Sequence, residues 1–320
     1  MATERPHAQA PRTLKMTQRR FGGPEVLEPA EGPRPAPAAG EILLRVHAVA
    51  VNPVDLQIRS GRAPLYGQPP FTLGCDVSGT VEALGDGVTG LRPGDEVFAR
   101  IDSGGYATHV TAPAAHFAPK PASLDHIHAA AAPTAVLTAW QALIDIAGVG
   151  PATRVLIHAA AGGVGHAAVQ LAKAEGAYVV ATARADRHDF LRDLGADEPV
   201  DYTAGDFTEA VHDIDAALDL IGGDYGPRTL NTLRPGGLFI TAVPGDPGLA
   251  PEEVEARGMR FAAVETRPSG ERLARIAALL ANGRIRIHVE AALPFAEAAK
   301  AHELGEAGRA KGRLVLVLPE

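Results

Sequence analysis

The chain has 320 residues, of which 46% are hydrophobic and 21% charged, so it is rich enough in apolar residues for packed cores and is not disordered throughout. At about 150 residues per domain, this length predicts two domains. Lys and Arg number 30 against 38 Asp and Glu, and a formal charge of −8 argues against nucleic acid as a partner. The single cysteine, Cys75, excludes an intramolecular disulfide and a zinc site built from several cysteines.

Neither a membrane span nor a secretory signal is expected. The longest stretch without Asp, Glu, Lys or Arg covers residues 126–144 and contains two histidines, a proline and a glutamine, so a buried helix explains it better than a span. The first twelve residues read as a loose tail, and no apolar signal region follows the initial methionine. These features predict a cytoplasmic protein with no membrane partner.

Residues 14–126 contain short alternating or apolar runs broken by glycine and proline, which is typical of a small β-barrel or sandwich. The clearest strands are expected over residues 41–51, 79–84 and 95–99, with turns at 85–87 and 92–95 and a loop over 33–39.

After residue 128 the pattern changes to alternating helices and apolar strands, which indicates a parallel sheet covered on both faces. Helices are expected over residues 129–147, 163–175, 187–194 and 227–233, and strands over 154–160, 178–182, 215–221 and 237–243. Near the end of the chain, a helix over 271–281, a strand over 284–290, a helix over 295–304 and a strand over 313–318 follow.

A glycine motif joins the strand that ends near Ala160 to the next helix. It reads Ala161-Gly-Gly-Val-Gly165, and its candidate cofactor contacts are Gly162, Gly163, Val164 and Gly165. Gly162 would let the backbone approach a pyrophosphate, and Gly165 would let the helix pack closely on the strand. The simpler interpretation is a helix start that needs glycine only for packing. The strand before the motif and the helix after it favour a dinucleotide site in a doubly wound Rossmann sheet.

The end of the following strand indicates which cofactor binds. Arg184 stands where an NAD-binding protein would have an acidic residue for the ribose hydroxyls, and Arg187 follows closely. Cations at this position suit the 2′-phosphate of NADPH. Asp186 lies close enough to pair with these arginines, and an ordinary solvated loop is the alternative.

Together with these residues, several motifs resemble the medium-chain dehydrogenase/reductase superfamily, in particular its zinc-free quinone oxidoreductase branch, which includes zeta-crystallin and polyketide enoyl reductase domains. The likeness covers nearly the whole chain from residue 14. It is carried by Phe21-Gly-Gly-Pro-Glu-Val26, Val51-Asn-Pro-Val-Asp-Leu-Gln-Ile-Arg-Ser-Gly61, Leu73-Gly-Cys-Asp-Val-Ser-Gly-Thr-Val81, Gly104-Gly-Tyr-Ala107, Leu137-Thr-Ala-Trp140, Leu194-Gly-Ala-Asp197 and Leu233-Arg-Pro-Gly-Gly237.

The resemblance implies an α/β fold with two domains. A GroES-like β-barrel catalytic domain would comprise residues 1–128 completed by 284–320, and an NADPH-binding Rossmann domain would comprise 129–283. The active site would lie between them. Members of this branch are usually homodimers paired through their nucleotide domains.

The resemblance also implies that no metal is bound. Zinc-dependent relatives place ligands where this chain has Asn52, Gly74-Cys75-Asp76 and the region 133–136. Two adjacent candidates without a third do not make a zinc site. Cys75 is therefore expected to be a small buried side chain rather than a nucleophile.

Further site residues follow from the resemblance. The nicotinamide would lie beside Asn52 and Asp55, with Thr138 near its ribose and the backbone of Val243 at its carboxamide. The 2′-phosphate would contact Arg187, Tyr202 and Arg309. Quinone reductases often carry tyrosines where this chain has Gln57 and Ala63, and the only nearby tyrosine is Tyr66.

The expected reaction is zinc-independent hydride transfer from NADPH to a quinone or an α,β-unsaturated ketone. Such substrates accept hydride without a strong Lewis acid, because the charge delocalises onto the carbonyl oxygen. Water or Tyr66 would supply the proton, and Gln57 would bond the carbonyl oxygen. Two alternatives remain: a tailoring reductase or cyclase of polyketide or other secondary metabolism with a narrow, bulky substrate, and a non-catalytic NADPH-binding protein.

Overall fold

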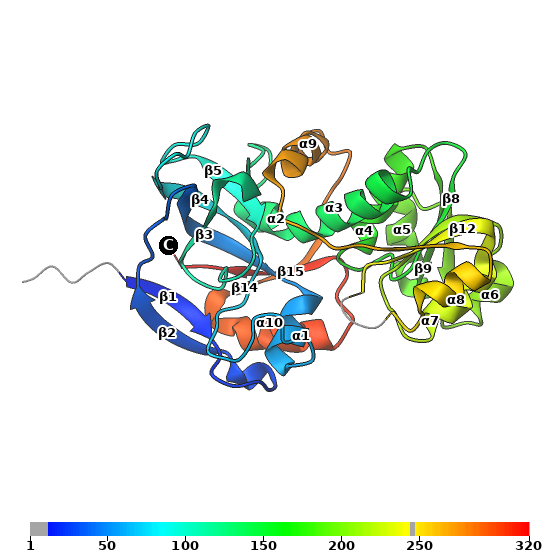
Figure 1. Ribbon diagram of the computed structural model, residues 1–320, viewed down its shortest axis with the longest axis horizontal. Coiled ribbons are helices and arrows are strands. Elements are labelled where there is room, and N and C mark those ends of the chain that lie inside the picture. Colours follow the sequence, from blue (N-terminus) through cyan, green and yellow to red (C-terminus); the bar gives the residue numbers. More distant parts are fainter. Residues whose placement is uncertain (1–11, 244–246, 320) are drawn as a thin grey trace, which may run out of the picture.

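The structure, a computed structural model, describes residues 12–243 and 247–319, so the expected N-terminal tail lies outside the described residues except for Arg12, which begins the first strand. Its strands form a two-stranded ribbon, a seven-stranded sheet and a six-stranded parallel sheet. Figure 1 shows the ribbon and the seven-stranded sheet in one lobe and the six-stranded sheet in the other. No helix of the described residues is long and apolar enough to cross a membrane.

The first lobe is built from both ends of the chain. Its strands are β1 (Arg12–Thr17), β2 (Glu28–Pro33), β3 (Glu41–Val51), β4 (Asp76–Leu84), β5 (Glu96–Arg100), β6 (His109–Pro113), β7 (Phe117–Pro119), β14 (Val289–Pro294) and β15 (Arg313–Val317). Its helices are η1 (Pro24–Val26), α1 (Pro53–Ser60), η2 (Ala114–His116), α2 (His126–Ala131), η6 (Phe295–Glu297) and α10 (Ala298–Glu306). The sheet order is β14-β15-β3-β4-β5-β7, with β6 also on β3, so the C-terminal strands close against the start of the chain.

The second lobe alternates strands and helices. Its elements are α3 (Pro133–Trp140), the π-helical turn η3 (Gln141–Ile146), β8 (Arg154–Ile157), α4 (Gly165–Ala174), β9 (Tyr178–Ala183), η4 (Ala185–Arg187), α5 (His188–Asp193), β10 (Glu198–Asp201), α6 (Phe207–Ala210), β11 (Ile214–Asp219), α7 (Tyr225–Thr229), η5 (Leu230–Thr232), β12 (Leu233–Thr241), α8 (Pro251–Ala256), β13 (Arg260–Ala263) and α9 (Gly270–Ala281). The sheet order is β10-β9-β8-β11-β12-β13. The order reverses between β8 and β11, the place where such sheets bind dinucleotides.

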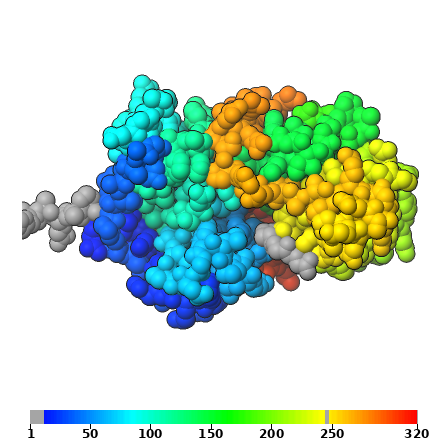
Figure 2. All heavy atoms as spheres, in the orientation of Figure 1, coloured from blue at the N-terminus to red at the C-terminus, as the bar shows by residue number. Residues whose placement is uncertain are grey.

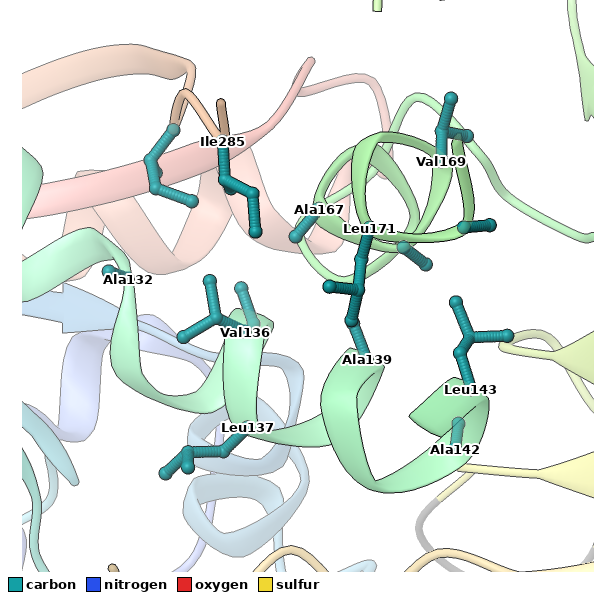
Figure 3. Packing of buried hydrophobic residues seen from close by; sticks show 14 of the residues in the cluster. Ala132, Val136, Leu137, Ala139, Ala142, Leu143, Ala167, Val169, Leu171 and Ile285 are labelled. Atoms are coloured by element: carbon teal, nitrogen blue, oxygen red, sulfur yellow. The ribbon is translucent and has the colours of Figure 1, made fainter. Parts of the chain in front are cut away.

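Alternating side chains of the buried strands serve the two faces of this sheet. Val155 and Ile157 of β8 join the core with α3 and α4, whereas Leu156 between them joins the opposite core with Phe239 of β12. Figure 3 shows the first of these cores, in which small alanines let α3 and α4 approach closely. The apolar runs of the sequence therefore correspond to strands that are buried on both faces.

Several element boundaries differ from the sequence-based expectation. The helix over 129–147 is divided, because Pro133 lacks the N–H needed to continue α2. The strand over 154–160 ends at Ile157, and Ala159 has a positive φ of 46° where the chain turns into the glycine loop. The strand over 284–290 begins only at Val289, because the residues before it bond to α4 instead of pairing in a sheet.

The two lobes are in direct contact at their junction. Helix α9 lies there, in contact with β7 of the first lobe and α3 of the second (Figure 2). The expected boundary at 128/129 falls inside α2, so the domain limits stay a prediction. The pairing of β15 with β3 joins the C-terminal segment to the first lobe.

Candidate functional site

The glycine motif forms a tight loop between β8 and α4. A Cβ on Gly165 would lie 2.3 Å from the carbonyl oxygen of Ala159 and 2.6 Å from the Cα of Ala160, so only glycine fits there. The N–H groups of Gly163 and Val164 donate to no acceptor within residues 12–243 and 247–319. Free backbone donors ahead of a helix, here the ten-residue α4, are the arrangement with which proteins bind anions.

The start of strand β15 of the first lobe contacts this loop. The N–H of Gly312 donates to the carbonyl oxygen of Ala161 at 2.9 Å. A Cβ on Gly163 would lie 3.1 Å from both Cδ and Nη1 of Arg313, so the guanidinium sits directly against the loop. The glycine loop therefore has positive charge beside it as well as free N–H groups.

Arg313 also belongs to a buried polar cluster in the first lobe. Its Nη1 donates to Oδ1 of Asn52 at 2.9 Å, and its Nη2 donates to Oδ2 of Asp76 at 2.8 Å. Asn52 donates to the same carboxylate at 3.1 Å, while Thr134 donates to its other oxygen through both N–H (3.0 Å) and hydroxyl (2.6 Å). We call Asn52, Asp76, Thr134 and Arg313 the Asp76 cluster. Both carboxylate oxygens of Asp76 accept hydrogen bonds within it.

Asp55 lies next to this cluster because β3 ends at Val51 and α1 begins at Pro53. Its carboxylate accepts the N–H of Asn52 at 2.8 Å and that of Gly74 at 3.1 Å. The side chain is completely buried. Burial, which the two backbone donors offset only in part, raises the pKa of Asp55 to about 7.

This pKa predicts a pH-dependent contribution to stability. A carboxyl whose pKa is higher in the folded than in the unfolded chain stabilises the fold while protonated, and that stability is lost as pH rises through the folded value. We expect the free energy of unfolding of the wild type, relative to Asp55→Asn, to fall between about pH 4, where an unfolded aspartate titrates, and about pH 7, the value in the fold. Urea unfolding across this range checks it; a difference that stays constant with pH would contradict the assignment.

Three further predicted residues surround the same region. The hydroxyl of Tyr66 donates to the carbonyl oxygen of Asp102 at 2.7 Å, and its half-buried ring packs edge-on against Phe71. Burial, together with the charges of Asp55 and Cys75, raises the pKa of Tyr66, so the phenol stays protonated. Gln57 is half-buried on α1. Cys75 is buried, as expected, and its sulfur accepts from Asn52 at 3.4 Å.

The predicted 2′-phosphate contacts gather at the end of β9. Arg184 and Arg187 flank Asp186 at 3.9 and 3.7 Å, so the expected pairing with this acid is present but loose. Arg187 also donates to the backbone carbonyl of Arg309, an exposed residue before β15. Tyr202 directly follows β10, which pairs with the end of β9, and is 37% exposed. Hydrogen bonds thus link Arg184, Arg187 and Arg309, and Tyr202 follows the neighbouring strand.

Thr138 and Val243 are the two remaining predicted contacts. Thr138 of α3 is buried, and its hydroxyl is 2.7 Å from that of Thr266. Val243 follows β12, and its N–H donates to Thr241 Oγ1 at 3.3 Å. Thr266 follows β13 and Val243 follows β12, so both predicted contacts lie where these parallel strands end.

The Asp76 cluster contains residues that the sequence-based interpretation did not assign to the site. Arg313 was only the start of a final strand, and Thr134 only part of a region aligned with zinc ligands. A charged residue at the start of an otherwise apolar strand is the one local signal for Arg313. Among residues 12–243 and 247–319, no three His, Cys, Asp or Glu side chains lie close enough to share a metal ion.

Comparison with known proteins identifies the family. Residues 38–122 match the alcohol dehydrogenase GroES-like domain, and residues 194–316 match the zinc-binding dehydrogenase family. The NAD(P)H oxidoreductase RTN4IP1, mitochondrial, of Danio rerio is 32% identical over 325 residues, which cover 88% of this chain and 84% of that protein. The chain belongs to the medium-chain dehydrogenase/reductase superfamily. Its branch is the zinc-free, quinone oxidoreductase-like one, and the protein is an oxidoreductase.

Two solved structures show how far the fold agrees. The quinone oxidoreductase from Coxiella burnetii has a TM-score of 0.92 and 34% identity, covering 97% of this chain and 100% of that one. The quinone oxidoreductase of Escherichia coli, solved in complex with NADPH, has a TM-score of 0.88 and 28% identity, covering 95% of this chain and 99% of that one. The expected α/β fold, with a GroES-like domain and a Rossmann sheet, is therefore confirmed.

Proposed function

We propose that this oxidoreductase uses NADPH, without zinc, to reduce a quinone or an α,β-unsaturated ketone. The observation that carries the proposal is the contact between the glycine loop and the Asp76 cluster through Arg313. This contact joins the glycine loop to a buried cluster of polar side chains. The NADPH bound by the Escherichia coli relative and the quinone oxidoreductase names of both solved structures support it.

The residues present fit the cofactor. Gly163 and Val164 offer free N–H groups, and the buried Nε of Arg313 has no partner within the described chain. These groups would hold the pyrophosphate, with Asn52, Asp55 and Thr138 on the nicotinamide side and the backbone of Val243 at the carboxamide. NADPH supplies a hydride when bound. The protein's part is to orient the substrate and exclude water.

Arg184 and Arg187 favour NADPH over NADH, because neither is tightly paired with Asp186. We expect the double variant Arg184→Ala/Arg187→Ala to reduce the ratio of kcat/KM for NADPH over NADH about a hundredfold or more, since each charge-assisted bond to a phosphate contributes about 1.5 to 3 kcal/mol. Steady-state kinetics with both cofactors check this. Arg192→Ala, which alters an exposed arginine paired with Asp189, serves as the control. An unchanged ratio would remove these arginines from the cofactor site.

The Asp76 cluster also supports zinc independence. Both oxygens of Asp76 already accept hydrogen bonds, and the guanidinium of Arg313 supplies the positive charge between Asn52 and Asp76. A metal ion would have to displace this buried ion pair and still find a third ligand. Activity retained after dialysis against a chelator is the expected result.

The proposed chemistry needs a proton at the α-carbon or the quinone oxygen after hydride has arrived. Tyr66 keeps its proton at neutral pH and lies in the loop after α1, so it is one proposed source, and water is the other. Gln57 of α1 is the proposed hydrogen-bond donor to the substrate's carbonyl oxygen, where negative charge develops.

The test is NADPH binding followed by turnover on 9,10-phenanthrenequinone and on a simple enone. Oxidation of NADPH with either acceptor is the expected result. Binding without turnover would favour the tailoring enzyme with a bulky substrate or the non-catalytic role. Absence of NADPH binding would overturn the proposal.

We also propose a homodimer in the cytoplasm. Strand β13 is an edge of the six-stranded sheet, with β12 as its only partner among the described strands, and could pair with a second copy. Light scattering after gel filtration, which gives the mass of the particle, would reveal a dimer or refute it.

A further inference from the structure

Helix α4 is fastened to the segment that crosses from α9 to β14. The amide of Gln170 donates to the carbonyl oxygen of Arg286 and accepts that residue's N–H, both at 2.9 Å. One turn earlier, His166 accepts the N–H of His288 at 3.2 Å. Figure 3 shows Ile285, at the start of this segment, beside Ala167 of α4. Two side chains of α4, four residues apart, thus hold residues 286–288.

The geometry fixes the tautomer of His166. A backbone N–H can only donate, so the Nε2 atom that receives the His288 N–H carries no proton. The proton is therefore on Nδ1, which donates to the carbonyl oxygen of Gly162 at 2.8 Å. Burial lowers the pKa of His166 to about 4, in agreement with a neutral ring. One imidazole thus joins the glycine loop to residue 288.

The hydrogen bonds continue from residue 288 into the candidate site. The carbonyl oxygen of His288 accepts the N–H of Arg313 at 2.9 Å, and the N–H of Gly312 donates to Ala161 in the glycine loop. Arg313 in turn bonds Asn52 and Asp76. The loop, the crossing segment and the Asp76 cluster therefore form one network across the junction of the lobes.

We propose that His166 is a positioning residue for the cofactor, because its imidazole holds the glycine loop at a fixed place relative to Arg313 and the Asp76 cluster. This inference rests on the proposed function, since it assumes that the loop binds the pyrophosphate. His166 touches no reacting atom; it acts through the loop and through residue 288.

His158 provides a matched comparison inside the same lobe. It is fully buried, like His166, and burial lowers its pKa to about 3. Its ring nitrogens lie 3.0 Å from the hydroxyl of Thr182 and 2.8 Å from that of Thr229, both in the second lobe. Replacing His158 therefore disturbs a buried histidine without cutting a bond between the lobes.

The experiment uses two replacements that each keep one half of the imidazole. The amide of His166→Asn reaches the Nδ1 position and still bonds Gly162, but it leaves the His288 N–H without an acceptor. The longer His166→Gln reaches the Nε2 position and restores that acceptor. In cofactor-free protein, we expect His166→Asn to speed hydrogen–deuterium exchange about fivefold in peptides covering His288 and Gly312, the effect of one lost hydrogen bond.

The same variant is expected to raise the Kd for NADPH about fivefold in a fluorescence titration, and His166→Gln to recover most of both losses. His158→Asn is expected to lower stability without changing either readout. The proposal would be overturned if His166→Asn exchanged hydrogen and bound NADPH like the wild type. It would also be overturned if His158→Asn lost as much affinity for NADPH as His166→Asn. If the wild type bound no NADPH, the proposed function would fail, while exchange in the free protein would still decide whether His166 holds the loop.

Discussion

Replacing Arg313 by methionine is expected to lower the free energy of unfolding by about 3 to 5 kcal/mol, because a buried carboxylate is left without its cation. Arg313 and Asp76 are only 3% and 0% exposed. Urea unfolding measures the loss. The control is Arg267→Met, which removes an ion pair with Glu265 at the surface, where both side chains are about three-quarters exposed; it should cost less than about 1 kcal/mol.

A second substitution separates the charge from the lost packing. Adding Asp76→Asn to Arg313→Met removes the unpaired charge, so part of the stability should return, while NADPH binding should remain weak because the loop has lost the guanidinium beside Gly163. A single variant Arg313→Met as stable as the wild type would show that the buried pair contributes little. A double variant with wild-type affinity for NADPH would remove Arg313 from the cofactor site.

Gly165→Ala is expected to raise the Kd for NADPH about a hundredfold or more, close to 3 kcal/mol. The new Cβ would collide with backbone atoms of Ala159 and Ala160, so either the loop or the start of α4 must move, and the free N–H groups of Gly163 and Val164 would move with it. Fluorescence titration with NADPH, supported by circular dichroism to show that the fold is kept, measures the effect.

Gly150→Ala is the matched control for that variant. A Cβ there would meet nothing within 4 Å, and the residue lies in the turn before β8, away from the loop. We expect unchanged NADPH binding. If Gly165→Ala bound NADPH as tightly as Gly150→Ala, the glycine loop would not be the pyrophosphate site.

Local features of the sequence were enough to predict the centre of the second lobe, with strands β8, β9, β11 and β12. Neighbouring residues determine apolar strands such as β8 and β9, the glycine motif between them and the helix that follows the motif. Their pattern can therefore be recognised without knowing the fold. The short edge strand β10 was not predicted, because Glu-Pro-Val-Asp carries little apolar signal and gains its place only by pairing with β9.

Only some residues of the candidate site could be predicted from the sequence. Asn52, Asp55 and the glycine loop follow from a motif, and Arg184 and Arg187 from their place after a strand. The role of Arg313 could not be predicted, because its partners Asn52 and Asp76 lie 261 and 237 residues away in the chain.

The sequence by itself therefore determined the central elements of the second lobe, the sheet type and the glycine loop, since these depend on periodicity and on contacts within a few residues. The tertiary structure alone decided that β15 pairs with β3, that residues 286–288 bond to α4 instead of forming a strand, and that Arg313 connects the glycine loop with Asp76. The physical reason is that a polar side chain is buried only where distant segments supply its partners, and that pairing is a property of the whole packed chain.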